Sequence, residues 1–171
     1  FHSATGLIGR GQILTSDHHI LREGIFANNL LNGPGSEYFP YEATCNEFSL
    51  AGLPIPTEPI VHLEGNFVDG ELEGEGKEYG IDGNVIYFGS FHKGLYEGEG
   101  VLYDNVNETM LQGIFKNGHL NGSGKRLTFF EQLIEEGEYG NDVLNGKGII
   151  YYANGQMEYE GEFKEGERYG Y

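Results

Sequence analysis

The residues best suited to chemistry are two short runs of metal-ligand types. His18 and His19 are adjacent imidazoles of the kind that bind zinc, but no third ligand lies at helical or strand spacing from them. Glu71, Glu73 and Glu75 offer the carboxylate oxygens that Ca²⁺ prefers, without the Asp, Asn and Gly residues of a dedicated calcium loop. We therefore expect a turn at the histidines, a solvated acidic strip at the glutamates, and no metal site.

A third candidate is the stretch NGSGKRL at residues 121–127, which is similar to the end of a phosphate-binding loop. Arg126 follows Lys125 where such a loop requires Ser or Thr, and the upstream glycine is one position out of register. The chain also has no Gly-x-Ser-x-Gly nucleophile motif. The sequence predicts a protein that is not an enzyme, with no catalytic residues and no cofactor.

The composition restricts both the fold class and the partners. The 171 residues include 29 Gly, 12 Tyr and 11 Phe, and this mixture disfavours helices because an interior glycine costs about 0.5–1 kcal/mol relative to alanine. Only 10 Lys and Arg stand against 27 Asp and Glu, giving a net charge of −17. We therefore expect no nucleic acid partner and no direct binding to anionic membranes. The single cysteine, Cys45, rules out an internal disulfide and fits a reducing compartment.

The glycines recur with a period of 24 residues. The series that opens each repeat consists of Gly65, Gly89, Gly113, Gly137 and Gly161, and Gly24 fits the same frame upstream. Further glycines follow at offsets of 5, 9 and 11 residues. Large apolar residues keep the same register, with Phe or Tyr two positions after the opening glycine, Leu or Tyr seven after it, and Tyr or Leu fourteen after it. A fixed period of this length is typical of stacked repeats.

These motifs resemble the MORN (membrane occupation and recognition nexus) repeat, whose pattern is roughly Tyr-x-Gly-x-Trp-x-x-Gly-x-x-x-Gly-x-Gly. The segments YFGSFHKGLYEGEG at 87–100 and YEGEFKEG at 159–166 match it, with Phe in the Trp position. The resemblance covers nearly the whole chain except about residues 41–60. It implies a scaffold of the kind found in cytoskeletal, ciliary or membrane-adjacent assemblies.

The spacing predicts an all-β fold in which 24-residue hairpins stack into a single elongated antiparallel sheet. Because alternate residues share a face of a strand, Gly89 lies between Tyr87 and Phe91 on an apolar face, and the opposite face is mostly polar. The missing side chain is expected to let a ring from the next strand lie across the glycine. The second glycine of each repeat predicts a hairpin turn, where Asn29 is a suitable substitute and Asp142 a poorer one.

Three regions follow from the repeat frame. Residues 1–40 are N-terminal repeats, the first one partial, and residues 61–171 are further repeats, the last one truncated. Residues 41–60 are a proline-containing insertion, expected as a loop because proline does not donate to a central ladder. The insertion is either a tolerated connection or a recognition loop or flap that offers Phe48, Leu50, Leu53 and Ile55. Neither terminus resembles a polar cap, so we expect a fragment of a longer array or end-to-end or edge self-association.

Two classes of function remain. The first is a scaffold that binds a helix or extended peptide of a protein partner along an aromatic-lined groove, in the cytoplasm and within a cytoskeletal or ciliary assembly. The residues expected to line that groove are Tyr87, Phe91, Tyr103, Phe115, Tyr139, Tyr151 and Tyr159. For the stripe itself, a packed core is favoured over a ligand-binding face. The second class, implied by the resemblance, is a regulatory or membrane-targeting segment of a larger enzyme of the lipid kinase or SET-domain methyltransferase type.

Overall fold

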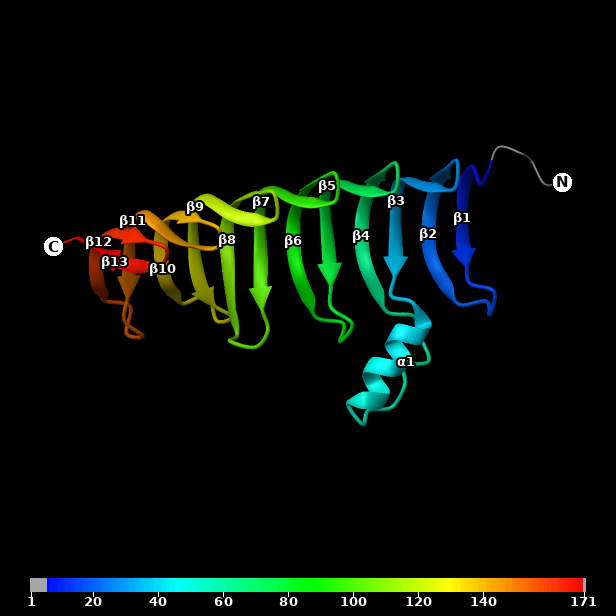
Figure 1. Ribbon diagram of the computed structural model, residues 1–171, viewed down its shortest axis with the longest axis horizontal. Coiled ribbons are helices and arrows are strands. Elements are labelled where there is room, and N and C mark those ends of the chain that lie inside the picture. The colour runs from blue at the N-terminus through cyan, green and yellow to red at the C-terminus, as the bar shows by residue number, and fades with distance from the viewer. Residues whose placement is uncertain (1–5, 171) are drawn as a thin grey trace. The chain divides into compact units, whose positions relative to one another are not determined.

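In the computed structural model, which describes residues 6–170, the chain forms two compact units, Phe1–Val85 (unit 1) and Ile86–Tyr171 (unit 2). The sheet in each unit is open and antiparallel, and each strand pairs with the next one in the sequence (Figure 1). Unit 1 contains β1 (Gly9–Leu14), β2 (Ile20–Ala27), β3 (Leu30–Tyr38), α1 (Tyr41–Leu50), β4 (Val61–Val68) and β5 (Glu71–Tyr79). The strands that follow are β6 (Val85–His92), β7 (Leu95–Asp104), β8 (Thr109–Lys116), β9 (His119–Thr128), β10 (Leu133–Gly140), β11 (Val143–Tyr151), β12 (Met157–Lys164) and β13 (Glu167–Tyr169). The prediction of an all-β fold built from stacked antiparallel hairpins is confirmed.

Tight two-residue turns close each hairpin on one side of the sheet, which we call the turn side. In the turn between β8 and β9, Asn117 and Gly118 both have positive φ, 51° and 89°. This pair of angles is characteristic of a type I′ turn, whose twist matches that of the flanking strands. Both residues also have positive φ in the other turns on this side, which are Asn28–Asn29, Asp69–Gly70, Lys93–Gly94, Asn141–Asp142 and Glu165–Gly166. Longer connections lie on the opposite side of each sheet, the loop side.

Hydrogen bonds fasten several of these turns to the preceding hairpin. The N–H of Gly118 donates to the carbonyl of Tyr96 at 3.0 Å, and the N–H of Asn117 donates to Glu97 Oε2 at 3.0 Å. The same pair of bonds recurs one repeat later, where Asp142 N–H donates to Leu120 O and Asn141 N–H to Asn121 Oδ1. The turn side therefore supplies a repeated polar contact between neighbouring hairpins.

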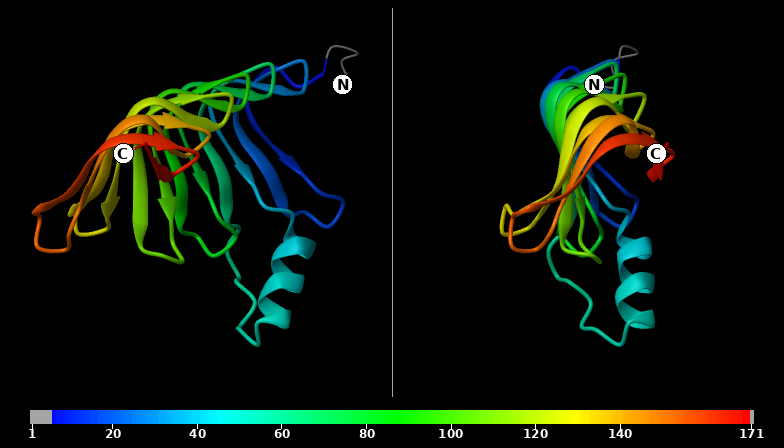
Figure 2. Two further views of the ribbon diagram at one scale, coloured as in Figure 1. Left: turned by 60° about the vertical axis from the view of Figure 1, so that its left-hand side comes forward. Right: turned by 90° about the vertical axis from the view of Figure 1, so that its left-hand side faces the viewer.

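A row of glycines crosses each sheet at the middle of its strands. In unit 2, Gly113 pairs with Gly100 on one side and with Gly124 on the other. A Cβ atom on Gly113 would lie 2.4 Å from the carbonyl oxygen of Ser123 and 2.7 Å from the Cα of Gly124. Only glycine permits this approach. The strands bend sharply along their length, as both views in Figure 2 show, and the ladder shifts register between Gly113 and Phe115.

The buried core lies mainly on the turn-side half of the strands. The residues two and seven positions after the opening glycine pair directly, as in Phe67 with Leu72 and Phe115 with Leu120. These four side chains are buried, with at most 1% of their surface exposed. Burying each such side chain stabilises the fold by about 1.5–3 kcal/mol. The predicted apolar register is thereby confirmed as core at the positions two and seven after the opening glycine, but not throughout the position fourteen after it, where Tyr103 and Tyr151 are only half-buried.

The prediction that a ring from the next strand covers each glycine is wrong in two respects. In the β8–β9 hairpin the group against the glycine pair is an aliphatic side chain, that of Leu120, whose methyl carbons lie 3.0 Å and 2.9 Å from Cβ positions built on Gly113 and Gly124. A ring does take this place at Gly100, but it is the ring of Tyr87, which belongs to the same hairpin. The leucine seven positions after the opening glycine reaches the glycine pair because it pairs with the residue two positions after that glycine, as Leu120 does with Phe115.

The insertion at 41–60 is not a loop throughout, because residues Tyr41–Leu50 form α1. Pro40 and Pro54 flank the helix and do not interrupt it. The helix ends in a Schellman motif, in which Gly52 (φ 68°) donates to Ser49 O and Leu53 donates to Phe48 O. Leu50 is 88% exposed, and Leu53 and Ile55 are also exposed, whereas Phe48 is half-buried. Within residues 6–170, no helix is long and apolar enough to cross a membrane.

Candidate protein-binding groove

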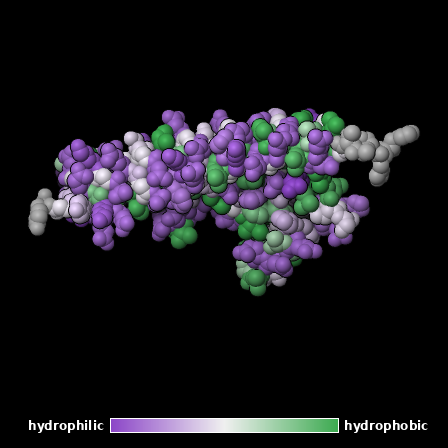
Figure 3. Space-filling view, turned by 45° about the horizontal axis from the view of Figure 1, so that its top comes forward, coloured by the Kyte–Doolittle hydropathy of each residue, from purple (hydrophilic) through white to green (hydrophobic). Residues whose placement is uncertain are grey.

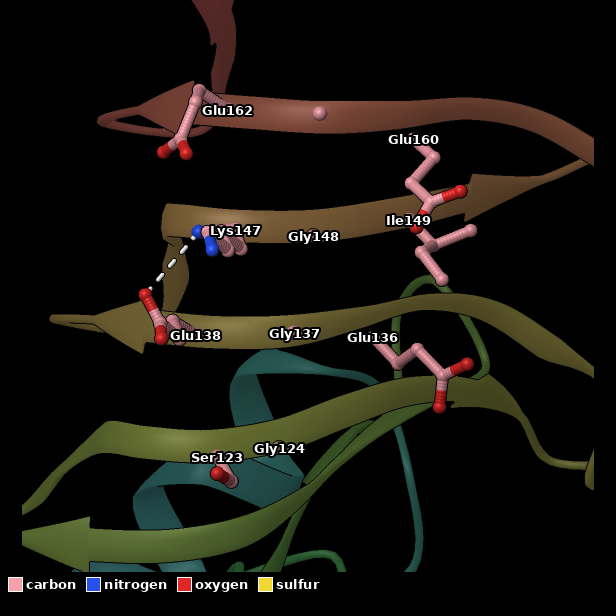
Figure 4. A pocket seen from close by; sticks show the side chains of 11 residues that line it. Ser123, Gly124, Glu136, Gly137, Glu138, Lys147, Gly148, Ile149, Glu160 and Glu162 are labelled. Atoms are coloured by element: carbon pink, nitrogen blue, oxygen red, sulfur yellow. Dashed lines mark hydrogen bonds between the residues drawn. The ribbon is translucent and has the colours of Figure 1, made fainter.

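A hollow on the sheet of unit 2 lies on the face opposite to the core, over the glycine row of β9–β12 (Figure 4). Its volume is about 630 Å³. The residues that line it are Ser123, Gly124, Glu136, Gly137, Glu138, Lys147, Gly148, Ile149, Glu160, Gly161 and Glu162. We call this hollow the glutamate groove.

The backbone of the glycine row forms the floor of the glutamate groove. Gly137 pairs with Gly124 and Gly148, and Gly148 pairs in turn with Gly161. Strand alternation directs the residues on either side of each glycine to the face opposite the core. Glu136 and Glu138 therefore stand on both sides of Gly137, and the neighbouring strands repeat this arrangement.

Two rows of side chains form the walls of the groove. On one wall, Glu138 Oε2 accepts a hydrogen bond of 3.2 Å from the backbone N–H of Lys147, and Glu162 lies opposite Lys147 on β12 (Figure 4). The other wall contains Glu136, Ile149 and Glu160. Four carboxylates thus border a groove whose lining includes a single lysine. Hydrophilic side chains also predominate over unit 2 in the view of Figure 3.

Tyr151 extends the second wall toward the loop side. It lies on the same face of β11 as Ile149, and its hydroxyl donates to Glu136 Oε1 at 2.5 Å. The hydrogen bond to this carboxylate, together with partial desolvation and the nearby negative charges, raises the pKa of the Tyr151 phenol above its ordinary value. The neutral phenol therefore donates a hydrogen bond that holds Glu136 in place.

The seven aromatic residues predicted as groove contacts do not form one surface. Four of them, Tyr87, Phe91, Phe115 and Tyr139, have at most 4% of their surface exposed. These four are wrong as contact residues because they are packed in the core, where a partner does not reach them without unfolding. The core interpretation of the stripe is correct for these four.

The remaining three residues lie on two different faces. Tyr103 and Tyr151 stand three positions after Gly100 and Gly148, an odd separation that turns both side chains to the face of the glutamate groove. Tyr159 lies on the core face, where its ring meets Phe163 edge-on at 5.4 Å. The structure therefore brings Tyr151 to the groove and separates it from Tyr159.

Sequence reasoning did not single out Glu136, Glu138, Glu160 or Glu162 as site residues. These residues were recognised as the polar face of their strands, and that assignment is confirmed. The available signal was strand alternation, since two carboxylates that flank a core-facing position share the opposite face of the strand. Because the glycines of β9–β12 pair with one another, the residues that flank them line up along one groove.

The other residues considered for metal or phosphate binding have ordinary structural roles. His18 has φ 66° in the 15–19 turn, and the His19 ring stacks on Tyr41 at 3.8 Å. Arg126, in the stretch similar to a phosphate loop, lies on β9 and donates to Glu135 at 3.2 Å. Among residues 6–170, no group of three or more His, Cys, Asp and Glu side chains is arranged to hold a metal ion.

Comparison with known proteins agrees with the repeat frame. The family model described as MORN repeat matches residues 23–40, 64–85, 87–105, 112–127, 136–157 and 159–171, which together are more than half of the chain. The insertion lies outside these matches. No curated protein sequence matches the chain significantly. With this coverage, and with the hairpin geometry of both units, the chain belongs to the MORN repeat family.

Proposed function

We propose that this MORN-repeat chain is a non-catalytic scaffold whose glutamate groove binds an extended, basic segment of a protein partner. The observation that supports the proposal is a strip of bare backbone bounded by Glu136, Glu138, Glu160 and Glu162 on an uncovered face of the sheet. Opposite charge gives such a surface its selectivity and speeds association. Ile149 and Tyr151 add apolar area against which the aliphatic stem of Lys or Arg packs.

The spacing of the carboxylates indicates the conformation of the bound segment. Glu136 and Glu160 lie on strands β10 and β12, two strand spacings apart, which corresponds to about 9.6 Å. A polyproline II segment advances about 9.3 Å in three residues and returns to the same face. We therefore expect the partner segment to carry basic residues at every third position.

Labelled peptides and fluorescence anisotropy test this proposal. One probe is a 12-residue proline-rich peptide with Arg at every third position, and the other has the same composition with its arginines clustered. We expect the spaced peptide to bind more tightly, with an affinity that falls as salt rises. The Glu136→Gln/Glu160→Gln variant should bind it at least about tenfold more weakly, equivalent to about 1.4 kcal/mol.

The matched control is Glu165→Gln/Glu167→Gln, which removes the same charge from unit 2 outside the groove. This variant should retain the affinity of the unmodified protein. Equal losses in the two variants would show that net charge, and not the groove, attracts the peptide. Equal binding by all three proteins would reject the groove.

Membership of the family supports the wider part of the proposal. MORN repeats are generally protein-interaction modules, and we assign this one to a cytoplasmic scaffold of a cytoskeletal or ciliary assembly. The excess of carboxylates supports a protein partner in preference to an anionic bilayer. Sedimentation with phosphatidylserine vesicles at low salt is the test, and strong co-sedimentation would contradict this choice of partner.

A further inference from the structure

We propose that the loop side of unit 2 is a second protein-binding surface, separate from the glutamate groove, that takes an amphipathic helix with basic flanks. The surface is formed by the loops 105–108, 129–132 and 152–156, which connect β7–β8, β9–β10 and β11–β12. We call the apolar side chains at its centre, Val106, Phe130 and Tyr152, the apolar row.

The apolar row is unusually exposed. Val106 and Phe130 each have 91% of their surface exposed, and Tyr152 has 51%. Phe129, which is also exposed, meets Tyr103 edge-on at 6.1 Å and joins the row to the sheet. Single exposed apolar residues are ordinary, but here three successive loops of unit 2 each present one.

These side chains are held by ordered loops. Asp104 accepts hydrogen bonds from the N–H groups of Val106 and Asn107, both at 3.0 Å, which fixes the 105–108 loop. The N–H of Phe129 donates to Glu108 O at 2.9 Å and ties the second loop to the first.

The third loop is attached in the same way. The side-chain amide of Gln132 donates to Ala153 O and ties the loop 152–156 to the loop 129–132. The loop residues therefore form one connected network. A surface ordered before binding loses less conformational entropy when a partner docks.

The spacing of the loops fits a helical partner, and a polyproline II segment, which advances about 9.3 Å in three residues, fits the same step. Successive loops on this side are separated by two strands, or about 9.6 Å. A helix rises about 10.5 Å over seven residues, so apolar residues at i, i+7 and i+14 reach three successive loops. An extended strand matches this step less well, because it advances about 6.7 Å between residues on the same face.

Carboxylates beside the apolar row indicate the charge of that helix. Glu108 and Glu131 are exposed next to Val106 and Phe130. The hydrogen bonds from Asn107 and the backbone hold the pKa of the Asp104 carboxyl below its usual value, so this group stays ionised. Lys or Arg on both sides of the apolar stripe complements these charges, whereas an anionic lipid surface is repelled by them.

Selection from a displayed library of 20-residue peptides tests the inference. The library has a fixed Ala, Glu and Lys helical background and random residues at one face, and it is selected on the full chain. We expect recovered peptides to carry large apolar residues at i, i+7 and i+14 with Lys or Arg beside them. Their affinity should fall at least tenfold on the Val106→Ser/Phe130→Ser variant.

The matched control is Leu95→Ser, which removes an apolar side chain of 50% exposure from the turn side of unit 2. This variant and Glu136→Gln/Glu160→Gln should both bind the recovered peptides as the unmodified protein does, which distinguishes this surface from the glutamate groove. The inference is overturned by recovery of peptides without the seven-residue spacing, by no enrichment, or by equal binding to the Val106→Ser/Phe130→Ser variant. Dimerisation of the unmodified chain that this variant abolishes would also overturn it, since the row would then be covered by a second copy.

Discussion

The two sides of each sheet differ in how closely one repeat resembles the next. On the turn side, every hairpin ends in a two-residue turn with two positive φ angles, and the bonds made by Asn117 and Gly118 recur at the next turn. On the loop side, the connections range from the loop 105–108 to the segment 39–60 that contains α1. The turns repeat one kind of contact with the preceding hairpin. The loops of unit 2 are also tied to one another, as by the bond from Phe129 N–H to Glu108 O, but they differ in length and in the bonds they make.

The glycine row, like the turn side, is required for the packing of the hairpins. Opening glycines such as Gly113 admit the backbone of the paired strand at a distance that no Cβ tolerates, and the apolar pair of the same hairpin lies in the core. On the opposite face, the backbone of the same row forms the floor of the glutamate groove.

The largest expected effect comes from a side chain placed in the glycine row. Gly113→Ala adds a Cβ 2.4 Å from Ser123 O at φ 156°, and we expect a loss of at least about 3 kcal/mol in the free energy of unfolding. The control is Gly118→Ala in the turn, where φ is 89° and nothing lies within 4 Å, with an expected loss of about 1–2 kcal/mol. Urea denaturation measures both. Equal losses would mean that the close approach of the strands is not what fixes glycine in the row.

Alkaline pH should weaken the core where a tyrosine covers the glycine row. Burial raises the pKa of Tyr87 to about 12, from an ordinary value of 10.0. Below pH 10 the phenol is neutral in both the folded and the unfolded chain, so its contribution is complete. Between pH 10 and about 12 the unfolded chain loses the proton first, and we expect about 1–2 kcal/mol of stability to be lost, with allowance for screening by solvent.

Tyr87→Phe isolates that contribution. The variant loses the hydrogen bond from the hydroxyl to Ser90 O, 3.0 Å long, at every pH. Its stability should nevertheless fall less steeply than that of the unmodified chain as pH rises from 10 to 12. Parallel curves over this range would show that Tyr87 titrates equally in the folded and unfolded states.

The turn at Asp142, where most repeats have glycine, tests how the residue at this turn position affects stability. Asp142 has φ 74°, and its carboxylate accepts the N–H of Leu120 at 2.7 Å and lies 2.7 Å from His119 Nδ1. Asp142→Ala removes the carboxylate and keeps the strained angle, so we expect a loss of about 1 kcal/mol. Asp142→Gly relieves the strain and should restore part of that loss. Thermal unfolding of both variants measures the difference, and a more stable alanine variant would contradict this account.

Much of the fold was predictable from the sequence because the turn side is periodic. The period fixed the hairpins, the turns and the apolar register, including the pairing of Phe67 with Leu72. The sequence marked Asp142 as a poorer turn residue, but it did not predict the compensating hydrogen bond from Leu120, which comes from the preceding hairpin and is not contained in single-residue preferences. Helix α1 was missed because the prolines in and beside the 41–60 insertion were taken to indicate a loop without regard to their positions. Gly52 followed by Pro54 is a helix C-terminal signal.

The candidate site was less predictable. Tyr103 and Tyr151 were grouped with Tyr87 because all three keep the repeat register, yet the odd separation from the glycine assigns the first two to the other face. That correction was available from the sequence by counting residues. The exposure of Val106 and Phe130 was not, because it depends on loop geometry set by Asp104 and by contacts between loops.

The smallest expected effect on stability is at the apolar row. Phe130→Ser removes a ring that is 91% exposed, so little surface returns to water on unfolding, and we expect a change within about 0.5 kcal/mol. Urea denaturation of this variant beside Phe115→Ser, whose ring is 1% exposed, compares the two sides of unit 2 directly. A substantial loss in Phe130→Ser would mean that the loop side also supports the fold. A negligible loss leaves recognition as the reason for keeping an aromatic ring in solvent on an ordered loop.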